Sequence, residues 1–163
     1  MRMRENLKEI YKVFISDETL LRLLYYKPEN ANDDPLNTTK DNILDMDDKK
    51  KWSIILDRIK STEKVDDLDD KEQKCRLCVH PGVRRRSFNN QTSSQHVIID
   101  VNVHVDIDNI DFRLAWICDR IEYLMFNNNI TGISKMSPAE GVKWNAPNGY
   151  VAYRLIFFFG SVN

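Results

Sequence analysis

Residues 93–108, SSQHVIIDVNVHVDID, alternate between apolar and polar side chains. Every odd position from 97 to 107 is valine or isoleucine. The even positions are mainly polar and include Asp100, Asn102, His104 and Asp106. Because successive side chains of a β-strand point to opposite faces, the run predicts one long strand with an apolar core face. We expect its polar face to be solvent-exposed, where the aspartates would also discourage unwanted strand pairing.

Two further segments predict strands of the same sheet. Residues 75–80 also alternate, and this strand is expected to break near Pro81 and Gly82. The closing run YVAYRLIFFFGSV, 150–162, is apolar on both faces in its second half. A strand of that kind is covered on both sides, so we expect it in the middle of the sheet. Residues 128–149 are expected to form a long connection with short extended pieces.

Other parts of the chain repeat apolar residues at helical spacing. Four helices are predicted, over residues 2–15, about 17–27, about 47–61 and 109–127. The second should end at Lys27, because Pro28 disfavours helical backbone before it. The last is expected to begin with Asp108 or Asn109 as its cap. Residues 28–42 are rich in turn formers and predict a surface loop.

The order of these elements, helices first and strands later without regular βαβ alternation, predicts an α+β fold. We expect a mainly antiparallel sheet packed against helices, with an N-terminal helical block. A length of 163 residues fits one domain, 1–163. Within it we expect N-terminal helices over 1–62, a solvated acidic loop over 63–74, and a strand-rich core over 75–163 that contains the helix 109–127.

The segment CRLCVHPG, residues 75–82, raises the question of a metal site. A structural zinc site needs four ligands, commonly as two close pairs, and this segment offers Cys75, Cys78 and His80. In a strand the two cysteines point to opposite faces and cannot share an ion. We therefore expect no metal here, although a metal or small enzymatic site built on these three residues stays open. Cys118 lies in an apolar run and is expected in the core.

Charged and aromatic side chains outside the predicted core are the candidates for binding. Three consecutive arginines follow the Pro-Gly turn and could contact a phosphate or an acidic surface of a partner. The run TEKVDDLDDKEQK supplies acidic groups that could pair with such an arm on a neighbouring subunit. Two aromatic residues in loops could anchor a contact. The interface candidates are Arg84, Arg85, Arg86, Phe88, Asp66, Asp67, Asp69, Asp70 and Trp144.

Composition and motifs narrow the function classes. Lys and Arg total 24 against 25 Asp and Glu, so the chain lacks the basic excess of proteins that wrap nucleic acid non-specifically. It contains no GxSxG, P-loop, GxGxxG or HExxH motif, and we expect neither catalysis nor a cofactor. No apolar run is long enough for a membrane span, and three cysteines suit a reducing cytoplasm.

The C-terminal half resembles a known family in the order and texture of its elements. The resemblance rests on HVIIDVNVHVDI, DFRLAWICDRIEYLMFN, NNITGISKM and GYVAYRLIFFFG. Together they resemble the neck proteins of tailed bacteriophages, most of all the tail terminators of the head–tail junction. The N-terminal region is similar in character to small phage structural proteins encoded between capsid and tail genes.

This resemblance implies a structural virion protein that forms a ring, in tail terminators a hexamer. Such a ring caps the tail tube, stops its growth and meets the head connector or stopper protein, while DNA passes through the lumen without sequence-specific binding. It implies no cofactor, no reaction and no membrane, and a location in the virion neck or tail after assembly in the host cytoplasm.

The extended region 28–74 departs from the tail-terminator pattern, so an adaptor, a stopper or another connector component remains open. A different alternative is a small nucleic-acid-binding module that uses Arg84–Arg86.

Overall fold

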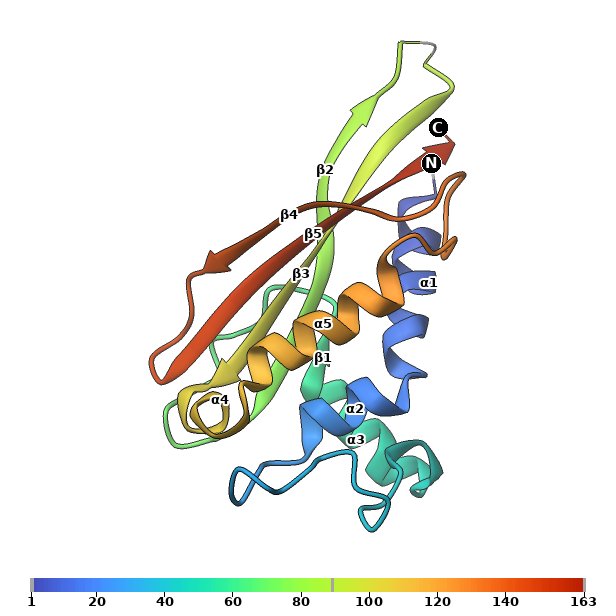
Figure 1. The fold of residues 1–163 in the computed structure, drawn as a ribbon. Coiled ribbons are helices and arrows are strands. Elements are labelled where there is room, and N and C mark those ends of the chain that lie inside the picture. Colours follow the sequence, from blue (N-terminus) through green and yellow to red (C-terminus); the bar gives the residue numbers. More distant parts are fainter. Residues whose placement is uncertain (1, 89, 163) are drawn as a thin grey trace.

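The structure, a computed structural model, describes residues 2–88 and 90–162, apart from the side chain of Ala139. Its helices are α1 (Met3–Ile15), α2 (Glu18–Tyr25), α3 (Asp48–Arg58), α4 (Val105–Asp111) and α5 (Arg113–Met125), and a 3₁₀ turn, η1 (Ile43–Asp45), precedes α3. Its strands are β1 (Ile59–Lys60), β2 (Cys75–Arg86), β3 (Thr92–His104), β4 (Ser137–Trp144) and β5 (Tyr150–Val162). They form one sheet in the order β1-β2-β3-β5-β4, parallel between β1 and β2 and antiparallel elsewhere (Figure 1). The predicted α+β fold with an N-terminal helical block is confirmed.

One face of the sheet carries the hydrophobic core. The odd-numbered residues of β3 from Val97 to Val103 are fully buried there, beside Leu155, Phe157 and Phe159 of β5. Helices α1, α2 and α5 pack on this face, and β5 lies inside the sheet between β3 and β4, as predicted (Figure 1). The expectation that the second half of β5 is covered on both sides is wrong, because Phe158 on the other face is 37% exposed. None of the helices in the described part of the chain is both long and apolar enough to cross a bilayer.

Two arginines of α5 hold the two ends of α2. Arg120 donates to both carboxylate oxygens of Asp17, the N-cap of α2, at 3.0 and 2.6 Å. At the other end, Arg113 donates to the carbonyls of Leu23 and Tyr26 at 2.6 and 2.7 Å. A carboxylate at a helix N-terminus and a cation at its C-terminus both match the helix dipole. These contacts therefore fix α2 against α5.

The predicted strand 93–108 and helix 109–127 are wrong at their common boundary. The strand ends at His104, and the chain then forms the short helix α4. The His104 ring accepts a hydrogen bond from the Asp106 amide at 3.2 Å and caps α4, whereas Asp108, the predicted cap, accepts from the Leu114 amide at 2.7 Å in the first turn of α5. Phe112, with a φ of 54°, separates α4 from α5. Two short helices therefore replace the expected long one.

The predicted break near Pro81 and Gly82 is also wrong, because β2 continues through both residues to Arg86. The pairing with β3 shifts between Pro81 and Arg84, which marks a bulge. Proline is tolerated here because β1 pairs only with Leu77 and Cys78 and leaves the outer edge of β2 without a strand beside Pro81. Glycine is needed next, because an added Cβ at Gly82 would lie 2.9 Å from the His96 side chain.

Candidate functional site

The second face of the sheet is polar and yet buried. The side chains of Asp100, Asn102 and His104 on β3 are only 4%, 2% and 1% exposed. The expectation of a solvent-exposed face is therefore wrong for these residues. Residues 63–74, the acidic segment, cross this face without forming a helix or strand. Most of their side chains are exposed, as a solvated loop predicts, but Leu68 is buried.

Polar contacts tie the acidic segment to the sheet along its length. Glu63 forms an ion pair with Arg154 of β5 at 2.6 Å. Farther along, the Asp70 carbonyl lies 3.1 Å from the His104 ring. The Tyr150 hydroxyl donates to the carbonyl of Glu72. The acidic segment therefore lies across the sheet and shields its polar face from solvent, which the sequence pattern did not predict.

Arg76 of β2 is the central attachment point of the acidic segment. Its side chain is fully buried and forms an ion pair with Asp67 of the acidic segment. It also donates to the carboxylate and the carbonyl of Asp57, both at 3.1 Å, and to the Lys64 carbonyl at 3.3 Å. Each of these acceptors would lose one donor if the guanidinium were removed, so Arg76 joins β2, the end of α3 and the acidic segment.

Acid should weaken the attachment of the acidic segment to the sheet. The hydrogen bond from Arg76 lowers the pKa of Asp67 to about 2, whereas the pKa of an aspartate in the unfolded chain is about 3.9. A lowered carboxyl pKa stabilises the fold above the unfolded pKa, and that stability is lost as pH falls from about 4 to about 2. We expect Asp67→Asn to flatten the decline in unfolding free energy over this window, measured by urea denaturation.

The control is Asp45→Asn, which removes an exposed carboxylate that forms no ion pair with any described residue. It should keep the wild-type pH profile. A wild-type profile in Asp67→Asn as well would contradict a stabilising Asp67–Arg76 pair.

Arg154 is the centre of a second charged cluster on the same face. It donates to both oxygens of Asp100 at 2.6 and 2.7 Å, and its guanidinium lies 3.4 Å from the ring centroid of Trp144. The His80 ring contacts Asp100 at 3.0 Å. Burial raises the pKa of Asp100, but hydrogen bonds from Arg154 and His80 outweigh it and the pKa is lowered. The cluster therefore keeps Asp100 charged and fastens Glu63 to the sheet.

Within the described residues, this cluster also contains a group with the composition of a metal site. One potential ligand atom each from Glu63, His80 and Asp100 lies within 4.8 Å of the others. Both carboxylates, however, already pair with Arg154. A divalent cation would face a fixed positive charge at close range, which is strongly unfavourable away from water. The geometry favours an ion-pair network over a metal centre.

The two neighbouring cysteines lie on opposite faces of the sheet, as predicted. Cys75 pairs with Val103 on the core face, and Cys78 pairs with Asp100 on the polar face. Burial raises the pKa of Cys75 to about 12 and that of Cys78 to about 11. Because the two sulfur atoms lie on opposite faces of the sheet, Cys75 and Cys78 cannot bind one ion together with His80. Cys118 packs against the core but is only partly buried.

Four of the interface candidates lie at the end of a projecting hairpin. We call residues 84–88 the arginine arm; Arg84 to Arg86 end β2, and Phe88 lies in the turn that leads to β3. The hairpin extends past the ends of the helices (Figure 1). Phe88 is fully exposed, and neither Arg85 nor Arg86 forms an ion pair with a described residue, whereas Arg84 is partly buried. The arm is therefore a strand end that presents cations and an aromatic ring.

The acidic candidates have contacts within their own subunit. Asp67 pairs with Arg76, Asp66 pairs with Lys64 at 3.1 Å, and Asp70 lies 3.5 Å from His104. Asp69 accepts hydrogen bonds from two following backbone amides, of Lys71 and Glu72. Trp144 ends β4 and is not in a loop; it packs under Arg154. The structure therefore gathers these residues on the sheet and leaves them apart from the arginine arm.

Sequence reasoning missed the partners that hold this face together. They are Glu63, Arg76, His80 and Arg154. One signal was present, since Arg76 and Arg154 interrupt the apolar runs CRLCV and YVAYRLIFFF. A charge at such a position is rarely buried unless it is paired.

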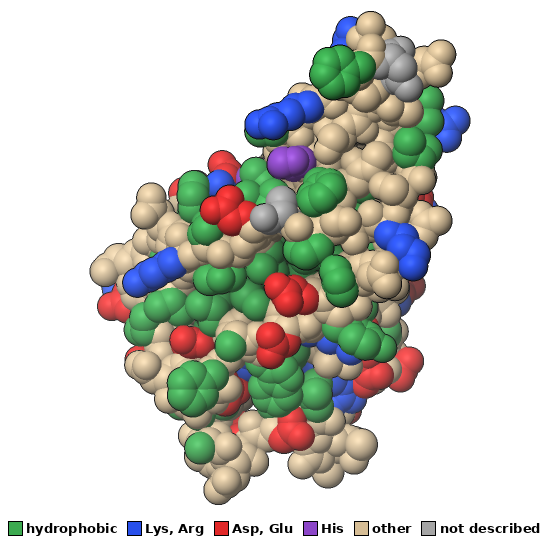
Figure 2. Space-filling view, turned by 45° about the horizontal axis from the view of Figure 1, so that its top comes forward, with side chains coloured by type: hydrophobic (Ala, Val, Ile, Leu, Met, Phe, Trp, Pro, Cys, Tyr) green, Lys and Arg blue, Asp and Glu red, His purple; other side chains and the backbone are tan. Residues whose placement is uncertain are grey.

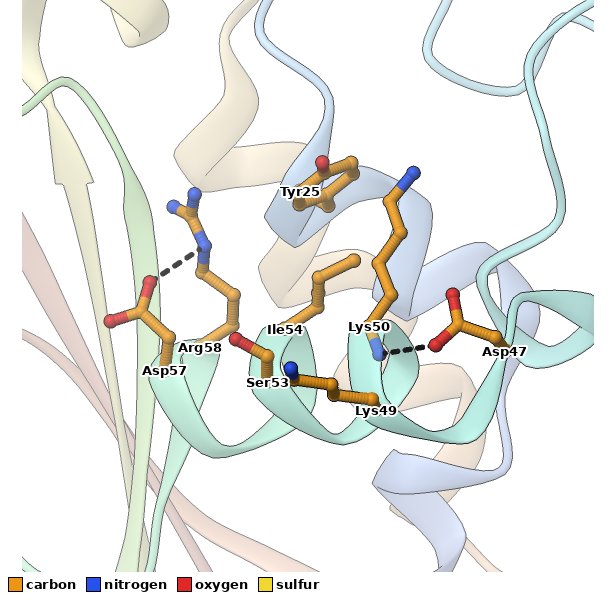
Figure 3. A pocket seen from close by; sticks show the side chains of 8 residues that line it. All are labelled: Tyr25, Asp47, Lys49, Lys50, Ser53, Ile54, Asp57 and Arg58. Atoms are coloured by element: carbon orange, nitrogen blue, oxygen red, sulfur yellow. Dashed lines mark hydrogen bonds and ion pairs between the residues drawn. The ribbon is translucent and has the colours of Figure 1, made fainter.

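A surface hollow of about 570 Å³ lies along α3 beside α2 (Figure 3). Lys49, Lys50 and Arg58 contribute cations to it, and Arg58 pairs with Asp57 at 3.2 Å. Asp47 accepts from the Lys50 amide and serves as the N-cap of α3. Its lining includes no histidine or cysteine, so the hollow offers neither a thiol nucleophile nor an imidazole base.

Comparison with known proteins places the chain in a family. The family model described as YomW matches residues 17–159. A protein of Bacillus subtilis (strain 168), described as "SPbeta prophage-derived uncharacterized protein YomW", is 30% identical over 167 residues, which cover 96% of each chain. The family match includes the helices from α2 to α5, the acidic segment and all the strands apart from the last residues of β5, whereas α1 lies outside it. The chain therefore belongs to the YomW family.

Proposed function

We propose that the chain is a structural virion protein of the phage head–tail junction, or neck, and forms a ring like that of a tail terminator. The observation that carries this proposal is the nearly full-length similarity to a prophage-derived protein. The projecting arginine arm adds support, because it offers charged and aromatic side chains to another molecule. In this role the ring caps the tail tube and joins it to the head connector or stopper.

The architecture suits a structural part that catalyses no reaction. Helices cover one face of the sheet and the acidic segment covers much of the other, and buried ion pairs fasten both layers. A rigid body with an extended arm can make contacts between unlike surfaces of neighbouring copies, and such contacts close into rings. DNA would pass through the lumen without sequence-specific binding, and no cofactor or membrane is needed. Assembly would take place in the host cytoplasm.

Native mass spectrometry of the purified protein, alone and with the tail-tube protein of the same phage, tests this role. We expect a closed oligomer, a hexamer if the likeness to tail terminators holds, and negative-stain images of rings at tube ends. Binding to the head-connector side only would favour an adaptor or a stopper. A strict monomer that binds neither tube nor connector would contradict a neck protein of any kind.

A small nucleic-acid-binding module is the second candidate. The exposed Arg85 and Arg86 beside the exposed Phe88 favour it, because cations and a stacking ring together bind single strands. It predicts that affinity for DNA falls steeply with salt, and that Arg85→Ala with Arg86→Ala lowers the slope of log affinity against log salt by about 2. The control is Lys49→Ala with Lys50→Ala. Absence of binding at low salt would exclude this candidate.

A further inference from the structure

A groove runs between α5 and the strands β5 and β4. Two adjoining hollows, of about 410 and 300 Å³, share Asp119 and Glu122 of α5 as lining residues. Their floor is apolar and consists of Tyr153, Leu155 and Phe157 of β5. Tyr123 and Phe126 at the end of α5 are 71% and 58% exposed. The groove thus combines an apolar floor with a partly aromatic rim.

The charged groups of this groove are acidic and lack partners. Neither Asp119 nor Glu122 forms an ion pair or a side-chain hydrogen bond with any residue in the described ranges. Their neighbours three and four positions away on α5 include no lysine or arginine, so the helix cannot neutralise them. Figure 2 shows a side of the molecule on which hydrophobic side chains lie next to acidic ones, with basic side chains on the projecting end.

We propose that this groove binds the arginine arm of a second copy of the chain. The arm has the complementary chemistry: Arg85 and Arg86 are exposed cations without an ion-pair partner among the described residues, and Phe88 is a fully exposed aromatic ring. Phe88 enters the apolar groove, and the two guanidinium groups pair with Asp119 and Glu122. This inference rests on the proposed ring and names the contact that builds it.

The contact joins two different surfaces of the subunit. The arm extends past the helices at one end of the sheet, whereas the groove lies along α5 (Figure 1). An interface between unlike surfaces repeats from copy to copy and closes into a ring when the rotation allows. The acidic segment, by contrast, is not needed as the partner of the arm, because Asp67 already pairs with Arg76.

Charge reversal tests this contact directly. The arm variant carries Arg85→Glu and Arg86→Glu, and the groove variant carries Asp119→Lys and Glu122→Lys. Each should weaken self-association by about tenfold or more, since like charges would then face each other. An equimolar mixture of the two should regain wild-type association, because every arm then finds a groove of opposite charge. Sedimentation velocity measures all four samples, and circular dichroism confirms that each variant is folded.

The possible results separate this inference from the proposed function. Wild-type protein that associates, with neither variant affected or no recovery on mixing, overturns the arm–groove contact and leaves the ring. Wild-type protein that stays monomeric at millimolar concentration also overturns the contact, while the neck role is then judged by whether assembled particles contain the chain. A groove variant that loses only tail-tube binding would show that the tube, and not a second copy, occupies the groove.

Discussion

Arg113→Met should lower the free energy of unfolding by about 3 to 5 kcal/mol, the cost of removing one partner from a buried ion pair. The Arg113 side chain is fully buried and pairs with Asp111 at 2.6 Å, and the Asp111 side chain is only 10% exposed. Its loss would also remove the donor to the carbonyls of Leu23 and Tyr26 at the end of α2. Methionine retains much of the volume, so the effect reports the lost charge and hydrogen bonds.

Urea denaturation of Arg113→Met measures this effect, and the same substitution at an exposed arginine is its control. Arg4→Met removes a weak pair at 3.9 Å between exposed side chains and should change stability by less than about 1 kcal/mol. Equal stability losses in the two variants would contradict a buried clamp between α5 and α2.

Arg154→Met should have an effect of similar size, about 3 to 5 kcal/mol, because it leaves Asp100 buried without its bidentate partner. Without the guanidinium, the pKa of Asp100 should rise, because burial is then opposed by His80 alone of the two partners that lower it. The stability deficit relative to wild type is complete above the raised pKa of the variant and should shrink as pH falls from that value through about 4, because protonation of Asp100 removes the unpaired charge. Unfolding free energies measured from pH 7 to pH 3 test both statements.

A double-mutant cycle isolates the Asp100–Arg154 pair from the rest of the cluster. The double variant Arg154→Met with Asp100→Asn carries no buried charge at this position, so it should recover part of the stability that Arg154→Met loses at pH 7. Additive losses with no dependence on pH would contradict an ion-pair network at the base of the acidic segment.

Alternation in the sequence predicted the core face of β3 correctly and its other face incorrectly. Period two separates side chains onto two faces, but it carries no information on what covers either face. Here the acidic segment covers the polar face. Its attachment depends on Arg76 and Arg154, two charged residues within apolar runs of β2 and β5. The polar face of β3 is buried because segments far apart in the chain pair with each other, and a local sequence pattern cannot predict such pairing.

The element boundaries that were predicted incorrectly depend on a side-chain cap and on the backbone conformation of single residues. Val105 and Ile107 continue the alternation of β3 in sequence, yet both belong to α4. The His104 cap and the left-handed backbone at Phe112 set the two ends of that helix. Phenylalanine rarely adopts positive φ, so nothing in the sequence indicated a break there.

The candidate binding residues were predicted in part. The exposed arginine arm was apparent from three consecutive arginines, but its acidic partner was sought in residues 63–72, where the run of acids is most conspicuous. The structure shows that Asp67 is used within the subunit. Asp119 and Glu122 were visible only as two acids with no lysine or arginine three or four positions away on their helix. This pattern gains meaning once β5 provides an apolar floor beside them.

Immunogold electron microscopy of purified particles, with an antibody against this chain, tests the central claim of a neck protein most directly. The particles are those of the phage that carries its gene, and a deletion of the gene is the control. The neck role predicts gold label at the junction of head and tail and, in the deletion, tails and heads that fail to join. Purified, infectious particles that contain none of this chain would contradict it.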